Sequence, residues 1–162
     1  MSVPFDKATA SVTVAASPVE AFRIFTEETD LWWRRGVRYR VAGRNPGSVL
    51  FEARPGGRLL ETFETGSGTK VVEMGEITAW DPPHRFCFDW RAGNFAEGEK
   101  TEVEVLFQPA GTGTYVTVNH RGWASLRPDH PVRHSEDGTA FIRRKAMWWG
   151  DLLTALRERI DP

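Results

Sequence analysis

The sequence predicts an α+β domain in which a curved antiparallel sheet of about six to seven strands wraps around one long C-terminal helix. Three observations carry this prediction. The stretch from Phe141 to Ile160 has the apolar spacing of one helix face, most of the preceding chain alternates as strands do, and short turns join those strands. Two short helices are expected after the first strand.

The C-terminal helix is predicted from apolar residues that follow one another at steps of 4, 3, 4, 3 and 4. These residues are Ile142, Ala146, Trp149, Leu153, Leu156 and Ile160. Phe141, Trp148 and Leu152 widen the apolar face to about half of the helix circumference, so we expect a broad sheet to cover it. Arg143-Arg144-Lys145 forms a basic cluster, which we assign to the solvated face of the helix.

The N-terminal elements are predicted by alternation and by capping residues. Residues 8–15 alternate between apolar and hydroxyl side chains, which is typical of a strand. Ser17-Pro18-Val19-Glu20 combines an N-cap Ser, a Pro at the first helical position and a Glu at the third. This helix is expected to end near Glu27. Thr29 to Arg34 predicts a second short helix, which Gly36 ends.

The chain from Val37 to Asn119 predicts strand after strand. Apolar or alternating segments occur at 37–41, 49–53, 59–64, 70–80, 86–90, 103–107 and 115–119. The turns between them are short and rich in Gly and Pro, so neighbouring strands are expected to be antiparallel, because parallel pairs need long crossovers. No internal repeat or linker interrupts the chain. We therefore expect a single domain over residues 1–162, with its core at residues 8–160.

Composition and charge exclude several classes of function. A net charge of −1 gives no electrostatic reason to expect a nucleic-acid partner. The single cysteine, Cys87, excludes an internal disulfide and suits a reducing compartment. Neither a secretory signal nor an apolar run of about 18 residues is present, so no membrane span is expected. We expect a soluble cytoplasmic protein that is a monomer or a homodimer.

Several motifs, taken in their order along the chain, resemble a known family. They are Ala15-Ala16-Ser17-Pro18-Val19-Glu20-Ala21-Phe22, Trp32-Trp33, Pro55-Gly56-Gly57-Arg58, Gly75-Glu76-Ile77, Trp80-Asp81-Pro82-Pro83-His84-Arg85-Phe86, Thr101-Glu102-Val103 and Trp148-Trp149-Gly150-Asp151-Leu152-Leu153. The chain resembles the START-like helix-grip (SRPBCC) superfamily, and within it bacterial proteins similar to the C-terminal domain of the Hsp90 ATPase activator. The resemblance implies a cavity between sheet and helix for lipids, sterols, polyketides or other apolar molecules. It supplies no fixed catalytic residues, although some members are cyclases or hydrolases.

The first candidate site is the set of large apolar residues that this fold would bring between the sheet and the C-terminal helix. We predict that these residues bind an apolar or amphipathic small molecule: Phe25, Trp32, Trp33, Phe88, Trp90, His120, Trp148, Trp149 and Leu152. Trp32 and Trp33 are expected at the rim. The alternative for each residue is ordinary core packing, because aromatic side chains dominate cores in general. As a set, large rings on a curved sheet leave gaps that suit a ligand.

His120 is the one catalytic candidate. It is in phase with Val116 and Val118, so its side chain is expected to point into the interior. A buried imidazole without a protein partner could be a ligand anchor or a general base, whereas one with partners is an ordinary core histidine. The loop Asp129–His134 contains two histidines, but its prolines exclude the helical spacing of a two-histidine metal site. We expect no metal and no cofactor.

Three function hypotheses follow, and a small-molecule carrier is the leading one. The alternatives are an enzyme of the cyclase or hydrolase kind in the same cavity, or a chaperone-associated interaction module. An all-apolar cavity favours the carrier, and a cavity containing an unpartnered His favours the enzyme. A filled cavity with an exposed apolar patch favours the interaction module.

Overall fold

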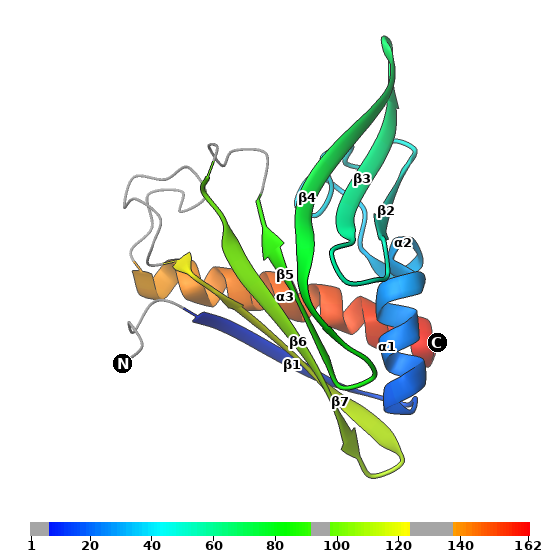
Figure 1. The fold of residues 1–162 in the computed structure, drawn as a ribbon, viewed down its shortest axis with the longest axis vertical. Coiled ribbons are helices and arrows are strands. Elements are labelled where there is room, and N and C mark those ends of the chain that lie inside the picture. The colour runs from blue at the N-terminus through cyan, green and yellow to red at the C-terminus, as the bar shows by residue number, and fades with distance from the viewer. Residues whose placement is uncertain (1–6, 92–97, 124–137) are drawn as a thin grey trace.

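The structure is a computed structural model that describes residues 7–91, 98–123 and 138–162. The elements are β1 (Lys7–Val14), α1 (Pro18–Glu27), α2 (Thr29–Trp32), β2 (Gly47–Phe51), β3 (Arg58–Thr65), β4 (Gly68–Asp81), β5 (Arg85–Trp90), β6 (Thr101–Ala110), β7 (Gly113–Arg121) and α3 (Gly138–Ile160). The strands form one antiparallel sheet in the order β1-β7-β6-β5-β4-β3-β2. The long helix α3 crosses one face of this sheet, and α1 lies beside its C-terminal end (Figure 1). The predicted α+β fold is confirmed.

The start of α1 is fixed by the predicted capping residues. The Ser17 hydroxyl accepts a hydrogen bond from the backbone N–H of Glu20 at 3.2 Å, and Pro18 is the first helical residue. The helix ends at Glu27, as predicted. Helix α2 is shorter than predicted, because the backbone is already extended at Trp33. That early end carries the following residues away from α2 and toward α3.

The strand predicted at residues 37–41 is wrong, because this segment forms turns. The relative exposure of Val37 is 88%, whereas Arg40 is 4% exposed. The Arg40 guanidinium donates to the Asp30 carboxylate at 2.6 Å and to the Trp33 carbonyl at 2.5 Å. The buried Glu61 carboxylate accepts the backbone N–H groups of residues 41 and 42, both at 2.8 Å. Side chains therefore satisfy the backbone groups that a neighbouring strand would have paired.

The inner face of the sheet supplies one side of the core. On β6 and β7 the inward residues Val103, Val105, Val116, Val118 and His120 are all buried, which confirms the predicted phase of these strands. Irregular register occurs in the β3–β4 and β4–β5 pairs, and such bulges bend a sheet locally. The sheet thus curves around α3 and places β5, β7 and α3 close together.

Candidate functional site

All nine residues of the predicted ligand site are buried. They come from α1, α2, the residue after α2, β5, β7 and α3. The rings of seven of them form a continuous series of contacts, with centroid separations from 4.8 Å for Phe25–Trp32 to 6.3 Å for Trp33–Trp90. The ring of Phe88 instead contacts Phe51 and Phe86. The predicted meeting of the sheet, the short helices and α3 therefore occurs, and packed side chains occupy it. Ligand binding by these residues stays a prediction.

Trp33 is at the centre of this packing. Its ring stacks on Trp90 with an interplanar angle of 20°, and it meets Trp148 at 6.0 Å and Trp149 at 5.9 Å, both edge to face. The indole N–H of Trp33 donates to the Tyr39 carbonyl at 3.0 Å, and that of Trp148 donates to the Arg38 carbonyl at 2.7 Å. The turns at residues 37–41 thus supply the acceptors that buried indoles require.

His120 has a protein partner on each ring nitrogen. The indole N–H of Trp149 donates to Nδ1 at 3.0 Å, and Nε2 is 2.7 Å from the Thr101 hydroxyl. An indole nitrogen can only donate, so Nδ1 is an acceptor and the neutral ring carries its proton on Nε2. That proton is donated to Thr101 Oγ1, whose own proton is directed at the Trp90 carbonyl, 3.4 Å away. The arrangement is that of a satisfied core histidine.

Burial lowers the pKa of the His120 imidazole well below its usual value, and the charge of Lys145 adds to the effect. Protonation would place a second proton on Nδ1, where Trp149 already donates. Both effects keep the ring neutral at physiological pH. His120 therefore does not meet the condition set for a free general base, namely a buried imidazole without a protein partner.

Lys145 is the residue that sequence reasoning missed. Its assignment to a solvated face is wrong, because its relative exposure is 7%, whereas neighbouring Arg143 is exposed. The Lys145 ammonium lies over three indole rings, at 4.3 Å from the centroid of Trp148, 5.4 Å from Trp123 and 5.9 Å from Trp90. The electron-rich faces of these rings attract a cation.

No carboxylate pairs with Lys145 among the residues that the structure describes, since its contacts there are with indole rings. Burial lowers the pKa of the Lys145 amine to about 7, and the charge of Arg144 adds to this shift. A large share of the amine is therefore unprotonated at neutral pH. A buried amine of this kind is unusual, because lysines are almost never buried unless paired.

Three hollows formed by described residues bear on ligand binding. The largest of the three has a volume of about 750 Å³ and lies between α2, the segment of residues 33–44 and the C-terminal half of α3. Trp32 and Trp33 line it, together with Asp30, Leu31, Arg34, Arg35, Tyr39, Arg44, Asp151, Ala155, Glu158 and Arg159. The prediction that they form the rim of the space between sheet and helix is not tested by this hollow. We call this site the α2–α3 hollow. The other seven predicted residues do not line it.

Polar contacts hold the walls of the α2–α3 hollow together. The Arg34 Nε atom donates to the Asp151 carbonyl at 2.7 Å, and the Tyr39 hydroxyl donates to the Asp151 carboxylate at 3.1 Å. Burial, followed by the hydrogen bond to Asp151 and by the negative charge of that carboxylate, raises the pKa of the Tyr39 hydroxyl. Arg35 approaches Asp30 only at 3.7 Å. No hydrogen bond or ion pair links the Arg44 guanidinium to another residue in the described part of the chain.

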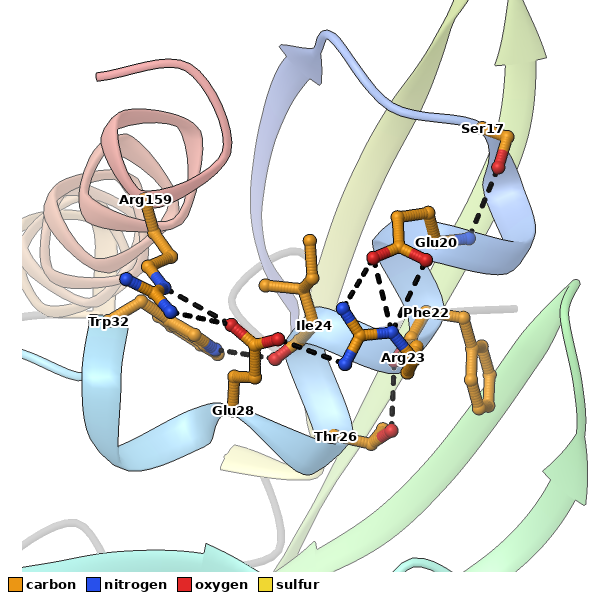
Figure 2. Close-up of polar contacts among 9 residues, drawn as sticks. All are labelled: Ser17, Glu20, Phe22, Arg23, Ile24, Thr26, Glu28, Trp32 and Arg159. Atoms are coloured by element: carbon orange, nitrogen blue, oxygen red, sulfur yellow. Dashed lines mark hydrogen bonds and ion pairs between the residues drawn. The ribbon is translucent and has the colours of Figure 1, made fainter.

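A chain of ion pairs links Arg159, which lines the α2–α3 hollow, to α1 (Figure 2). Arg159 of α3 pairs with Glu28 at 3.0 Å, and Glu28 also pairs with Arg23 at 2.9 Å. Arg23 in turn donates to Glu20. Figure 2 shows these side chains in a row along α1, with Trp32 donating to the Ile24 carbonyl beside them. The row fixes the C-terminal end of α3 against α1 and α2.

The other two hollows are smaller. An apolar groove of about 340 Å³ lies between α1 and the turn after β4, and is lined by Val19, Phe22, Arg23, Thr26, Glu27, Ala53, Trp80, Pro82 and Pro83. A third hollow, of about 240 Å³, lies between α2 and β2. Within the described ranges, no three His, Cys, Asp or Glu side chains are grouped to hold a metal ion. The histidines of the Asp129–His134 loop lie outside the described residues.

Comparisons with known proteins agree on the fold. The model of the family described as Activator of Hsp90 ATPase homolog 1-like protein matches residues 15–144. The solution structure of an Aha1 dimer from Colwellia psychrerythraea is 19% identical, with 96% of each chain covered and a TM-score of 0.61. A protein of unknown function from Staphylococcus aureus is 12% identical and has a TM-score of 0.67, with 96% of this chain and 93% of that chain covered.

A protein from Mesorhizobium loti is also similar, at 17% identity and a TM-score of 0.63, with 96% of each chain covered. At these identities the likeness concerns the fold alone. The comparison with curated proteins gives no match. No helix in the described ranges is long and apolar enough to cross a membrane.

Proposed function

The chain belongs to the Activator of Hsp90 ATPase homolog 1-like family, and from this premise we propose that it is a binding protein for an amphipathic small molecule that carries an acidic group. The ligand occupies the α2–α3 hollow rather than the interior between sheet and helix. The family fold supports a ligand-binding or co-chaperone-like module in general. The choice between these functions rests on the hollow itself.

The observation that carries this proposal is the size and lining of the α2–α3 hollow. Its volume of about 750 Å³ falls within the range of about 300–1,000 Å³ that is usual for small-molecule sites. Tyr39 provides most of the aromatic surface, and the edges of Trp32 and Trp33, which are 3% and 2% exposed, border it. The polar atoms of these three rings are already bonded to the protein. Such a surface favours a flat or alkyl group over a fully polar ligand.

The arginines of the hollow favour an anionic group on that ligand. Arg34 lines the hollow and uses its Nε atom for the Asp151 carbonyl. Arg35 and Arg44 are exposed. Arg35 has only long contacts, with the Asp30 carboxylate at 3.7 Å and the Gly47 carbonyl at 3.5 Å, and Arg44 has no partner among the described residues. Guanidinium groups bind carboxylates through paired, charge-assisted hydrogen bonds, which are stronger than neutral ones. A carboxylate is therefore the group that this lining recognises best.

Calorimetric titration with 2-naphthoate tests the proposal, with the neutral 2-naphthamide as the comparison ligand. We expect saturable binding of 2-naphthoate at one site per chain, and binding of 2-naphthamide that is roughly tenfold weaker or more, because the amide lacks the charge. The double variant Arg35→Gln/Arg44→Gln should bind both ligands about equally. Both arginines are exposed, so the variant is expected to fold.

The matched control is Arg143→Gln/Arg157→Gln, which removes two exposed charges from α3 outside the hollow. This control should keep the preference for 2-naphthoate. Equal losses in both double variants would mean that net charge alone attracts the probe, and the proposal would fail. Absence of binding by the unaltered chain would also refute it for aromatic acids.

A chaperone-associated interaction module is the second candidate, and two observations favour it. Packed rings occupy the space between α3 and the sheet, and the apolar groove exposes Val19 with a relative exposure of 65%. The family description refers to an Hsp90 ATPase activator. For this candidate, the chain should raise the ATPase rate of an Hsp90 chaperone, and Val19→Asp should abolish the rise. Met147→Asp, which alters an equally exposed residue on α3, is the control.

A further inference from the structure

The segment between α2 and β2 contains a compact loop at residues 36–43, which we call the closed loop. The backbone N–H of Gly36 donates to the Gly43 carbonyl at 3.0 Å, so the two ends of the loop meet. Within the loop, the Gly36 carbonyl accepts the backbone N–H groups of Tyr39 and Arg40 at 3.0 and 2.9 Å. Two indoles of the core also donate to carbonyls of the loop. These bonds fix its conformation.

The closed loop has its charged and apolar side chains in the reverse of their usual places. Arg40 is buried, and its guanidinium donates to the Asp30 carboxylate and to three backbone carbonyls. The two valines face outward, with relative exposures of 88% for Val37 and 54% for Val41. One exposed valine is ordinary on a protein surface. Two on one fixed loop of eight residues keep apolar area in water at a single protrusion.

The segment that contains this loop is also strongly basic. Residues 31–51 include five arginines and no Asp or Glu, although the net charge of the whole chain is −1. Arg40 spends its charge inside the protein, on Asp30. Arg38 and Arg44 are exposed, and among the described residues no carboxylate pairs with either of them. The closed loop thus combines exposed valines with positive charge that the protein does not neutralise.

We propose that the closed loop docks the protein on the surface of a membrane that contains anionic phospholipids. Val37 and Val41 enter the boundary between headgroups and acyl chains, and Arg38 and Arg44 bind the phosphates. Surface elements bind membranes through buried apolar area together with attraction to anionic lipids, and guanidinium groups form paired hydrogen bonds with phosphate. The inference does not rest on the proposed ligand, because Val37, Arg38 and Val41 do not line the α2–α3 hollow.

The shape and composition of the closed loop favour a membrane over an acidic protein or a nucleic acid. A side chain as exposed as Val37 projects from the surface, so a protein partner would need a matching pocket, whereas lipid headgroups give way around it. Valine is also under-represented among the residues that dominate protein interfaces. Single-stranded nucleic acid is held by aromatic stacking as well as by charge. The one ring of the loop, Tyr39, is half-buried and bonded to Asp151.

Flotation with lipid vesicles tests the inference on the intact chain without any added ligand. One set of vesicles is pure phosphatidylcholine, and the other is a mixture of phosphatidylcholine and phosphatidylglycerol. We expect binding to the mixed vesicles to be at least roughly tenfold stronger, because each basic residue near an anionic surface strengthens binding about fivefold. Added salt should reduce this preference, since it screens exposed charges.

Variants of the loop and matched controls locate the contact. Val37→Ser/Val41→Ser removes apolar area without a change in charge, and Arg38→Gln removes one charge. Each should weaken binding to the mixed vesicles about fivefold or more. The controls Val71→Ser on β4 and Arg143→Gln on α3 should bind like the unaltered chain. All of these side chains are exposed, so thermal unfolding should not change.

Binding of 2-naphthoate by the loop variants separates this inference from the proposed function, and it should stay as in the unaltered chain. Loss of 2-naphthoate binding alone would refute only the ligand proposal. Absence of binding to the mixed vesicles would overturn the membrane inference, as would equal losses in the loop variants and their controls. Polyglutamate is the probe for an acidic protein. If it binds as tightly as the mixed vesicles and the valine variant binds both normally, the loop recognises charge alone and the inference fails.

Discussion

At the scale of single residues, two buried titratable groups distinguish this core from an ordinary one. Lys145 lies in the N-terminal half of α3 and His120 on β7, and burial lowers the pKa of each. His120 is stabilised as a neutral acceptor by Trp149, whereas Lys145 has only aromatic faces around it. His120 therefore contributes to packing, and Lys145 reduces the stability of the fold at neutral pH.

Lys145→Met should raise the free energy of unfolding at pH 7 by about 1–4 kcal/mol, because an apolar side chain replaces a poorly solvated amine. The unfolded chain holds the Lys145 proton up to about pH 10.5, while the folded chain releases it at about pH 7. The stability of the unaltered chain should thus rise relative to the variant between pH 7 and pH 10.5. Chemical denaturation of both proteins across this range measures the difference. A constant difference would contradict the assignment.

His120 should make stability fall as the solution becomes acidic. Its pKa in the folded chain is lowered well below 6.5, so below pH 6.5 the unfolded chain binds a proton that the folded chain does not. The slope can reach about 1.4 kcal/mol per pH unit. Thermal unfolding between pH 6.5 and pH 5 should show this loss in the unaltered chain and a smaller one in His120→Gln. Parallel curves for the two proteins would refute the account.

Single residues were predicted best where a repeating pattern fixed their direction. Strand alternation placed His120 in the interior correctly. The same phase argument could have found Lys145, since it falls on the apolar face of α3 between Phe141 and Trp149. Its charge led to the opposite assignment. Charge is a sound guide for most lysines and failed here, because three indole faces surround the amine.

At the scale of elements, the segment of residues 33–44 determines the α2–α3 hollow. It carries Arg34, Arg35, Tyr39 and Arg44 and has no helix or strand of its own. Its shape depends on two buried side chains, Arg40 and Glu61, which satisfy its backbone groups. The strand prediction at residues 37–41 failed because the acceptors of Arg40, on Asp30 and Trp33, lie outside the alternating segment.

Glu61→Ala should destabilise the segment and weaken ligand binding together. The substitution leaves the backbone N–H groups of Val41 and Ala42 without their acceptor, which costs on the order of 2 kcal/mol. Binding of 2-naphthoate should weaken as well, because the wall of the hollow loses its support. Glu64→Ala on the same strand is the control, since Glu64 is exposed. Equal effects of the two substitutions on unfolding would count against this role.

At the scale of the whole molecule, the order of the elements and the antiparallel sheet could be predicted because turns and capping residues are local signals. The α2–α3 hollow could not, because Arg34 and Asp151 meet across 117 positions of sequence. The nine predicted ligand residues converge as expected, yet they pack on one another. Periodicity shows which face of an element is buried, and it does not show whether opposing faces leave a space.

The location of the ligand is the central claim, and nuclear magnetic resonance of the indole N–H groups tests it most directly. The chain has seven tryptophans, each of which gives one indole signal. Titration with 2-naphthoate should shift the signals of Trp32 and Trp33 saturably, because both line the hollow. The signals of Trp80, in the apolar groove, and of Trp123, beside Lys145, should stay in place. Shifts at Trp80 with unchanged Trp32 and Trp33 would contradict the account.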